Sequence, residues 1–392
     1  MSRASDAFNA LCAGMVAALV FFPPAVEAQQ FSVLHSFHGT VNDGRQPFAG
    51  VIRDEVGNLY GTTWHGGYRE CRSGCGTVFK LAPDGTETLL HRFNVNDGAM
   101  PGSGGVIADA TGTLYGTTTG GGVYGQGTVF KLAPDGTETV VHSFHGVDGS
   151  NPAQDLILDP AGNLYGVTNV GGAGGHGTVF KLTSDGTLSV LHAFAGPPAD
   201  GSEPYGGVIA DAAGNLYGTT PYGGADDSGT VFRLAPDGTE TVLYSFSSLI
   251  QGCLQGCHPV GGLTLDAAGN LYGTAERGGT GRYGMVFKLA PDGTLSVLHY
   301  FSANPDGAYP DAGLVFDRQG NLYGTTSYGG AYGFGTIFKV KPNGHGYSIL
   351  HSFDGSDGNS PRARLIVDRS DLYGTTLMGG SHNIGVVFQL RK

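Results

Sequence analysis

The stretch Asn215-Leu216-Tyr217-Gly218-Thr219-Thr220 decides the fold, because its central tripeptide Leu-Tyr-Gly occurs seven times along the chain, at steps of 50 to 55 residues. The seven tyrosines are Tyr60, Tyr115, Tyr165, Tyr217, Tyr272, Tyr323 and Tyr373. A repeat of about 50 residues is typical of the blades of a β-propeller. The spacing therefore predicts seven copies of one structural unit.

Each repeat contains four short runs of Val, Ile, Leu, Tyr, Phe and Thr, bounded by Gly, Asp, Asn and Pro. In the fourth repeat these runs are residues 207–211, 215–220, 229–234 and 241–246, and we name them strands A to D. Four such strands make one propeller blade. The sequence thus predicts an all-β, seven-bladed β-propeller with four-stranded blades.

The two ends of the repeated region are complementary. The first repeated element is a strand of type D at residues 33–37, and the last is a strand of type C at residues 386–390. We expect the N-terminal strand to complete the last blade, because this pairing removes an exposed sheet edge. The alternative, an open stack of β-repeats, would gain nothing from the offset. A single domain is expected over residues 29–392.

The first 28 residues differ in composition from the repeats. Arg3 precedes an apolar run at residues 10–22, and the small-residue sequence Val26-Glu27-Ala28 follows. This pattern predicts a secretory signal peptide at residues 1–28, because the apolar run is short for a membrane span. We expect a secreted or periplasmic monomer without a membrane anchor. Its 20 basic and 31 acidic residues give a net charge of −11, which disfavours nucleic acid as a partner.

Four cysteines remain after the predicted cleavage, in two close pairs. They are Cys71, Cys75, Cys253 and Cys257. A shared zinc site is the alternative, but the pairs belong to repeats on opposite sides of the predicted ring. In an exported protein two local disulfides, Cys71 to Cys75 and Cys253 to Cys257, are the better interpretation.

Two recurrent polar positions have structural as well as functional interpretations. Strand D carries a histidine in six repeats, which we interpret as structural because strand D is the outermost strand. The connections from strand D to the next strand A carry Asp43, Asp97, Asp148, Asp200, Asp306 and Asp357. These carboxylates could surround the channel mouth and bind Ca²⁺. We favour the alternative, in which each aspartate stabilises its own turn. No other cofactor is predicted.

The loops that vary between repeats are the candidate binding surface. By strand order, the B–C loops and the D–A connections emerge on one face, and short turns emerge on the other. The variable loops supply eight candidate ligand-binding residues, with blade 1 at the centre of the site. These are Trp64, His65, Tyr68, Tyr124, Tyr222, Asp226, Arg277 and Tyr332. Aromatic rings beside charged groups suit a sugar or a peptide.

The repeat Gly-Asn-Leu-Tyr-Gly-Thr-Thr, Gly-Thr-Val-Phe-Lys-Leu, Pro-Asp-Gly-Thr and Leu-His-Ser-Phe resembles the choice-of-anchor tandem repeat GloVer-containing proteins of bacteria. The resemblance covers about residues 31–390, and strands A and B also resemble those of NHL propellers. It implies an exported repeat protein and supplies no catalytic residues. The C-terminal sorting anchor of many members has no counterpart here, which implies release.

Two hypotheses for function follow. The first is a non-catalytic binding module for an extracellular glycan or an envelope partner, which needs only the aromatic loops. The second is a hydrolase or lyase that acts on an extracellular polymer or lactone, with His65 and Glu70, or Glu276 and Arg277, as candidate catalytic groups. The chain has no Gly-x-Ser-x-Gly, His-Glu-x-x-His or phosphate-loop motif. We favour the binding module and leave enzymatic activity open.

Overall fold

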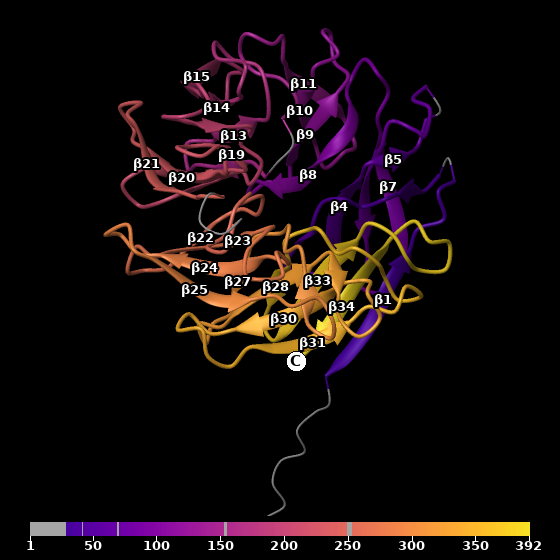
Figure 1. Ribbon diagram of the computed structural model, residues 1–392. Coiled ribbons are helices and arrows are strands. Elements are labelled where there is room, and N and C mark those ends of the chain that lie inside the picture. The colour runs from indigo at the N-terminus through magenta and orange to yellow at the C-terminus, as the bar shows by residue number, and fades with distance from the viewer. Residues whose placement is uncertain (1–28, 41, 69, 153–154, 249–252) are drawn as a thin grey trace, which may run out of the picture.

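A computed structural model describes residues 29–40, 42–68, 70–152, 155–248 and 253–392. The predicted signal peptide at residues 1–28 lies outside this part of the chain. The described residues contain no helix, and accordingly none that could span a membrane. They form seven four-stranded antiparallel sheets arranged in a ring (Figure 1), which confirms the predicted seven-bladed β-propeller.

The blades follow one another along the chain. Blade 1 consists of β3 (Ile52–Arg53), β4 (Leu59–Thr63), β6 (Thr77–Leu81) and β7 (Glu87–Arg92). Blade 2 consists of β8 (Ala99–Ala108), β9 (Leu114–Gly120), β10 (Thr128–Leu132) and β11 (Glu138–Ser143). Blade 3 consists of β12 (Ile157–Leu158), β13 (Leu164–Thr168), β14 (Thr178–Leu182) and β15 (Leu188–Ala193). Blade 4 consists of β17 (Val208–Ala210), β18 (Leu216–Thr220), β20 (Thr230–Leu234) and β21 (Glu240–Ser245). Blade 5 consists of β22 (Thr264–Leu265), β23 (Leu271–Ala275), β24 (Met285–Leu289) and β25 (Leu295–Tyr300). Blade 6 consists of β27 (Val315–Phe316), β28 (Leu322–Thr326), β30 (Thr336–Val340) and β31 (Ser348–Ser352). Blade 7 consists of β32 (Ile366–Asp368), β33 (Asp371–Thr376), β34 (Val386–Arg391) and β1 (Gln30–Ser36).

The N-terminal strand closes the ring, as predicted. Strand β1 pairs antiparallel with β34, from Gln30 opposite Arg391 to Ser36 opposite Val386, and the two strands lie side by side in Figure 1. The pairing includes a β-bulge just before the strand D histidine, His35, and the same bulge recurs between strands C and D of blades 1 to 6. Blade 7 therefore reproduces the geometry of the others although its strands come from both ends of the chain.

The glycine of each Leu-Tyr-Gly tripeptide makes room for a phenylalanine ring of strand C. In blade 6, a Cβ atom on Gly324 would lie 2.6 Å from Cζ of Phe338, a residue that is fully buried. The equivalent distance is 2.6 or 2.7 Å in all seven blades, which is far shorter than an ordinary contact between carbon atoms. The glycine recurs because it permits this close approach.

The tyrosine of the tripeptide anchors the turn between strands A and B. In blade 4 its hydroxyl donates a hydrogen bond to the carboxylate of Asp211 (3.0 Å), and Oδ1 of Asp211 accepts hydrogen bonds from the backbone N–H groups of Ala213 and Asn215. Equivalent tyrosine–aspartate hydrogen bonds occur in blades 1 to 6. In blade 7 the tyrosine hydroxyl accepts a hydrogen bond from Gln389. These tyrosines therefore have a structural role in each blade.

The B–C loops and the D–A connections lie on one face, because each connection pairs with the B–C loop of the blade that it enters. In blades 1, 4 and 6 the pairs are short strands, namely β2 (Gly44–Arg45) with β5 (His65–Gly66), β16 (Gly201–Ser202) with β19 (Tyr222–Gly223), and β26 (Gly307–Ala308) with β29 (Tyr328–Gly329). Single bridges or the extended strands β8 and β9 make the same contact in the other four blades.

Candidate functional site

A cavity of about 910 Å³ lies at the centre of the ring, because residues from all seven blades line it. Its wall consists largely of apolar side chains of the innermost strands, strands A. They include Ile52, Ile107, Ile157, Ile209, Val315 and Ile366. The cavity extends to the face of the B–C loops, where Glu276, Arg277, Ser327 and Tyr328 also line it. Its volume is in the range of small-molecule binding sites.

One position of the repeat controls how far the backbone of each blade approaches the next. The third residue after the connection proline is glycine in five blades, such as Gly262 after Pro259. A Cβ atom on Gly262 would lie 2.5 Å from the carbonyl oxygen of Gly206, so the close approach requires glycine. Blades 3 and 7 depart from this rule and carry Asp155 and Arg364 instead. Both side chains line the central cavity.

The guanidinium group of Arg364 connects three blades across the cavity wall. Its Nε donates to the carbonyl oxygen of Leu314 in blade 6 (3.1 Å), and one terminal nitrogen donates to Oγ1 of Thr264 in blade 5 (3.0 Å). The same threonine hydroxyl donates to the Leu314 carbonyl (2.6 Å). A charged side chain fixed by hydrogen bonds at a cavity wall is positioned in advance for a ligand.

Two carboxyl groups in the cavity have raised pKa values. Burial raises the pKa of Asp155 to about 6, although the positive charge of Arg364 opposes this shift. Burial also raises the pKa of Asp311 to about 6, with Arg362 as the main opposing influence. Nε of Arg362 lies 3.6 Å from Oδ2 of Asp311. Carboxyl groups with perturbed pKa values in a cavity mark a candidate functional site.

Substitution of Asp155 by Asn is expected to raise stability at pH 8, by up to about 3 kcal/mol for a pKa moved from 3.8 to about 6. A raised folded-state pKa stabilises the protein fully below the unfolded pKa, and this contribution is lost as the pH rises through about 6. The denaturation midpoint of the variant should therefore exceed that of the wild type by an amount that grows between about pH 4 and pH 7.

Asp135→Asn is the control for this pH series. Hydrogen bonds from Thr137 lower the pKa of the exposed Asp135 carboxyl. The stability of Asp135→Asn relative to the wild type should therefore fall as the pH rises, whereas that of Asp155→Asn should increase. A difference between Asp155→Asn and wild type that does not depend on pH would show that ionisation of Asp155 carries no cost in the folded protein.

Aromatic side chains surround the charged groups at the loop face of the cavity. They are Phe48, Tyr205, Tyr309 and Tyr328. The rings of Tyr309 and Tyr328 meet edge to face, with centroids 5.7 Å apart, and 46% of Tyr328 is exposed. The arrangement offers aromatic faces beside carboxylates and guanidinium groups.

The structure brings few of the eight predicted ligand-binding residues to the cavity. Arg277 lines it. Trp64 lies directly behind the lining residue Phe48, with ring centroids 5.1 Å apart, and stacks on His65. Nε1 of Trp64 is shielded from solvent and has no hydrogen-bond partner. Burial lowers the pKa of His65.

The other predicted residues do not line the cavity. Tyr68 lies under the guanidinium group of Arg92 at the end of strand D of blade 1, and Tyr124 contacts His145 just after strand D of blade 2. Tyr222 packs against His258, and Asp226 accepts a hydrogen bond from Ser247. Tyr332 is 64% exposed. These residues occupy several separate places around the loop face.

Most of the charged and aromatic residues that do line the cavity were not predicted from the sequence. They are Phe48, Asp155, Tyr205, Tyr309, Asp311, Arg362 and Arg364. A signal was present, because Asp155 and Arg364 replace a glycine that the other five repeats keep. The predicted residues were drawn from the long B–C loops, whereas these seven residues belong to the short connections that enter strands A.

Both predicted disulfides are present, between Cys71 and Cys75 and between Cys253 and Cys257. Each closes a short loop on the face of the B–C loops. Cys75 is fully buried in the hydrophobic core of blades 1 and 2, and its carbonyl oxygen accepts a hydrogen bond from Met100. The first disulfide therefore attaches the B–C loop of blade 1 to the core.

The six connection aspartates do not line the central cavity. Each carboxylate instead lies beside the histidine of the preceding strand D, and accepts a hydrogen bond from a backbone N–H three to five residues earlier. The pairs are His35–Asp43, His91–Asp97, His142–Asp148, His192–Asp200, His299–Asp306 and His351–Asp357, with N–O distances from 2.7 to 3.7 Å. The aspartates thus stabilise their own connections, as the turn interpretation expected, and the premise of a carboxylate ring at the channel mouth is wrong.

A family model described as the Gloeobacter/Verrucomicrobia repeat matches residues 69–257 and 250–392 of the chain. No protein of curated function matches it in sequence. Among solved structures, puromycin hydrolase is 15% identical over 85% of this chain and 50% of that chain, with a TM-score of 0.57. The extracellular domain of a putative hybrid two-component system from B. thetaiotaomicron is 13% identical over 92% of this chain and 40% of that chain, with a TM-score of 0.57.

A putative 6-phosphogluconolactonase from Bacteroides uniformis is 17% identical over 84% of this chain and 91% of that chain, with a TM-score of 0.54. The chain spans half or less of the length of the first two structures. At these identities the similarities show a shared propeller fold and carry no further information about function.

Proposed function

We propose that this chain, which belongs to the Gloeobacter/Verrucomicrobia repeat family, is an exported propeller that binds a ligand without catalysing a reaction. The ligand is an extracellular glycan or another envelope component, and it binds at the central cavity. The two disulfides support export, because such bonds persist in oxidising compartments. The ligand enters from the face of the B–C loops, where side chains from several blades line the cavity.

One observation carries the proposal. Three tyrosine rings, three carboxyl groups and three guanidinium groups converge on one cavity of about 910 Å³, although they come from five different blades. Sugars present apolar faces that stack on aromatic rings and hydroxyl groups that hydrogen-bond to charged side chains. Arg364 is already fixed by two hydrogen bonds, so little side-chain entropy is lost when a ligand binds to it.

A hydrolase or lyase is the second candidate. It is favoured by the pKa values of Asp155 and Asp311, both raised to about 6, because a carboxyl group that holds its proton near neutral pH can act as a general acid. The described residues of the cavity include no cysteine or histidine beside these carboxyl groups. Binding therefore remains the function that the geometry supports best.

A glycan and polymer array with the purified protein tests the proposal, run with and without Ca²⁺. Tyr328→Ala should weaken binding of an array ligand by about 1 to 3 kcal/mol if the ring stacks on it, by analogy with base–aromatic stacking. Tyr332→Ala is the matched control, because Tyr332 lies in the same loop, is exposed, and does not line the cavity. The Tyr332→Ala variant should bind the array ligand with the affinity of the wild type.

Two results would contradict the proposal. Equal losses of affinity in Tyr328→Ala and Tyr332→Ala would place the ligand outside the cavity. Release of products from an array polymer or a lactone, abolished in Asp155→Asn and Asp311→Asn, would establish the enzymatic alternative. Trp64→Ala should reduce affinity less than Tyr328→Ala, because Trp64 acts only through its contact with Phe48.

A further inference from the structure

The residue four positions before the strand D histidine recurs at the interface between consecutive blades. This residue lies against the histidine–aspartate pair of the preceding blade. In blade 7, Phe31 stacks on His351 with ring centroids 3.8 Å apart, and in blade 6, Tyr347 stacks on His299 and donates a hydrogen bond to Asp306. Leucine, Leu188 or Leu295, occupies the position in blades 3 and 5.

Blades 1, 2 and 4 carry glutamate at this position. The residues are Glu87, Glu138 and Glu240. Burial, together with the negative charge of the aspartate in the preceding pair, raises the pKa of each carboxyl to about 7. In all three, Oε1 is shielded from solvent and has no hydrogen-bond partner. A buried carboxyl group without a partner is costly, so its presence at three of the seven interfaces requires an explanation.

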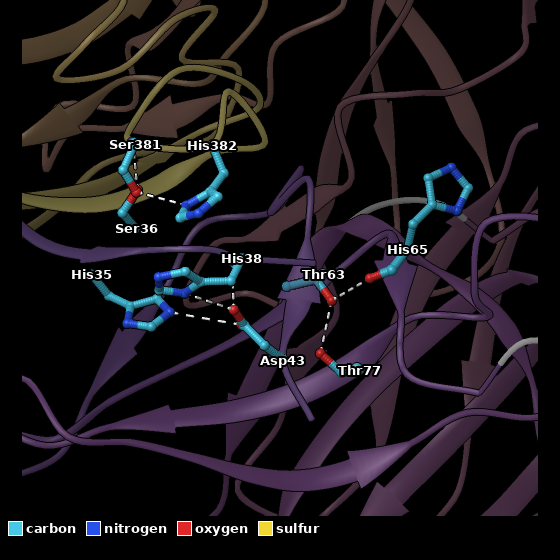
Figure 2. A network of polar contacts seen from close by, with 9 residues as sticks. All are labelled: His35, Ser36, His38, Asp43, Thr63, His65, Thr77, Ser381 and His382. Carbon is cyan, nitrogen blue, oxygen red and sulfur yellow. Dashed lines mark hydrogen bonds and ion pairs between the residues drawn. The ribbon is translucent and has the colours of Figure 1, made fainter. Parts of the chain in front are cut away.

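The interface between blades 7 and 1 differs from the other two in having a second histidine. His38 lies just after β1, and its Nδ1 is 3.3 Å from Oδ2 of Asp43. Nε2 of His35 lies 3.7 Å from Oδ1 of the same carboxylate. The rings of His35 and His38 both point toward Asp43 (Figure 2), and the donor atoms of the three residues all lie within 4.8 Å of one another.

Three polar atoms at this interface lack the partners that their burial requires. They are Nε2 of His35, Oδ1 of Asp43 and Oε1 of Glu87. Only 6% of Asp43 is exposed. The histidine and aspartate are directly hydrogen-bonded in His142–Asp148 (2.7 Å), in His351–Asp357 (2.8 Å) and, beside Glu240, in His192–Asp200 (3.1 Å). The wider spacing at His35 and Asp43 leaves both atoms free to contact a common ligand.

We propose that His35, His38 and Asp43 bind one Zn²⁺ ion, or a divalent transition-metal ion of similar preference, at the interface between blades 7 and 1, and that the Glu87 carboxylate, which lies outside this cluster of ligand atoms in the structure, turns toward the ion as the fourth ligand. Two imidazoles and two carboxylates form a ligand set typical of tetrahedral Zn²⁺, and the two carboxylates balance its charge. Ca²⁺ prefers a shell of six to eight oxygen atoms. His38, with 52% of its side chain exposed, provides the route by which the ion enters.

The ion would have a definite structural role. His35 belongs to β1, the strand that completes blade 7, whereas Glu87 begins strand β7 of blade 1. A metal ion coordinated by both residues attaches the N-terminal strand to blade 1, in addition to its backbone pairing with β34. Among the described residues, this is the interface whose sequence carries both the glutamate and a second histidine. The ligand atoms of His91, Asp97 and Glu138, and those of His192, Asp200 and Glu240, also lie within 4.8 Å of one another, but each of these clusters has a single histidine.

The test uses protein from expression of the full-length chain, freed of metal with EDTA and then titrated with Zn²⁺. We expect one equivalent to bind and to raise the Tm. His38→Ala and Glu87→Gln should each weaken binding by at least about tenfold and remove the rise in Tm. With Co²⁺ as a probe, the wild type should show the strong visible absorption of a tetrahedral site.

Two variants are matched controls. His145→Ala removes an equally placed histidine, 3.2 Å from Asp148, at an interface whose following blade carries Leu188. Glu138→Gln removes the equivalent glutamate at an interface that has no second histidine. Both should bind one equivalent with wild-type affinity. Unchanged Zn²⁺ affinity in either His38→Ala or Glu87→Gln, an equal loss in the controls, or absence of binding by the wild type would overturn the proposal.

Discussion

Deletion of residues 29–40 should lower the Tm more than any single substitution in the protein, because it removes the strand that closes the ring. The deletion takes away all the backbone pairs between β1 and β34 and exposes β34, of which residues 386–390 are buried. It also removes Phe37, which is fully buried in a hydrophobic core with Val51, Phe79 and Val387. Blades 7 and 1 both lose contacts, so unfolding should begin at this interface.

Phe37→Ala gives the same test within an intact chain. Truncation of a fully buried phenylalanine costs about 3 to 5 kcal/mol, whereas Val33→Ala, at a half-exposed position of the same strand (39% exposed), should cost less than about 1 kcal/mol. Differential scanning calorimetry of the deletion and of both variants provides the measurement. A deletion protein that melts at the wild-type temperature would contradict closure of the ring by β1.

Gly324→Ala is expected to destabilise the protein by about 1 to 3 kcal/mol, although it adds a single methyl group. The new Cβ would lie 2.6 Å from Cζ of Phe338 and 2.8 Å from Cδ2 of Leu314, so one of these buried side chains must move. The cost should fall when Phe338 is shortened, because Phe338→Leu removes the atom that clashes. A double-mutant cycle measured by chemical denaturation gives the coupling, expected at about 0.5 to 3 kcal/mol.

Gly320→Ala separates this steric effect from backbone strain. Gly320 has a φ of +78°, and a methyl group on its Cα would have no atom within 4 Å, so alanine there costs about 1 to 2 kcal/mol through the backbone alone. This cost should not depend on Phe338. If Phe338→Leu reduces the destabilisation caused by Gly324→Ala and by Gly320→Ala equally, the contact between strands B and C is not the reason for the glycine at position 324.

The repeat itself explains why the fold could be predicted so fully. Tyr217, Gly218 and their six equivalents fixed the blade length, and the strand D sequence at residues 33–37 indicated how the ring closes. The cysteine pairs followed from the same blade assignment. These features recur or are local, so their physical roles are visible in a single chain.

The site could be predicted less well, because its residues depend on which side chains meet across the ring. Asp155 and Arg364 are far apart in sequence and become neighbours in one cavity only when seven blades surround it. Trp64, the single tryptophan of the chain, was predicted to bind ligand, but its ring packs against Phe48. For the connection aspartates the sequence left two interpretations, a turn and a ring at the channel mouth, because sequence alone does not show that each one turns back toward the histidine of the preceding strand.

The pairing of β1 with β34 also determines when this protein can reach its native state during synthesis. The ribosome releases the N-terminal strand first and its partner last, after an interval on the order of tens of seconds at ordinary elongation rates. Until then the nascent chain can form individual blades from local contacts, but the last blade lacks its outer strand. If the chain is exported as proposed, a nascent chain that cannot close early would stay open during passage through a translocation channel, and the ring would be completed on the far side of the membrane.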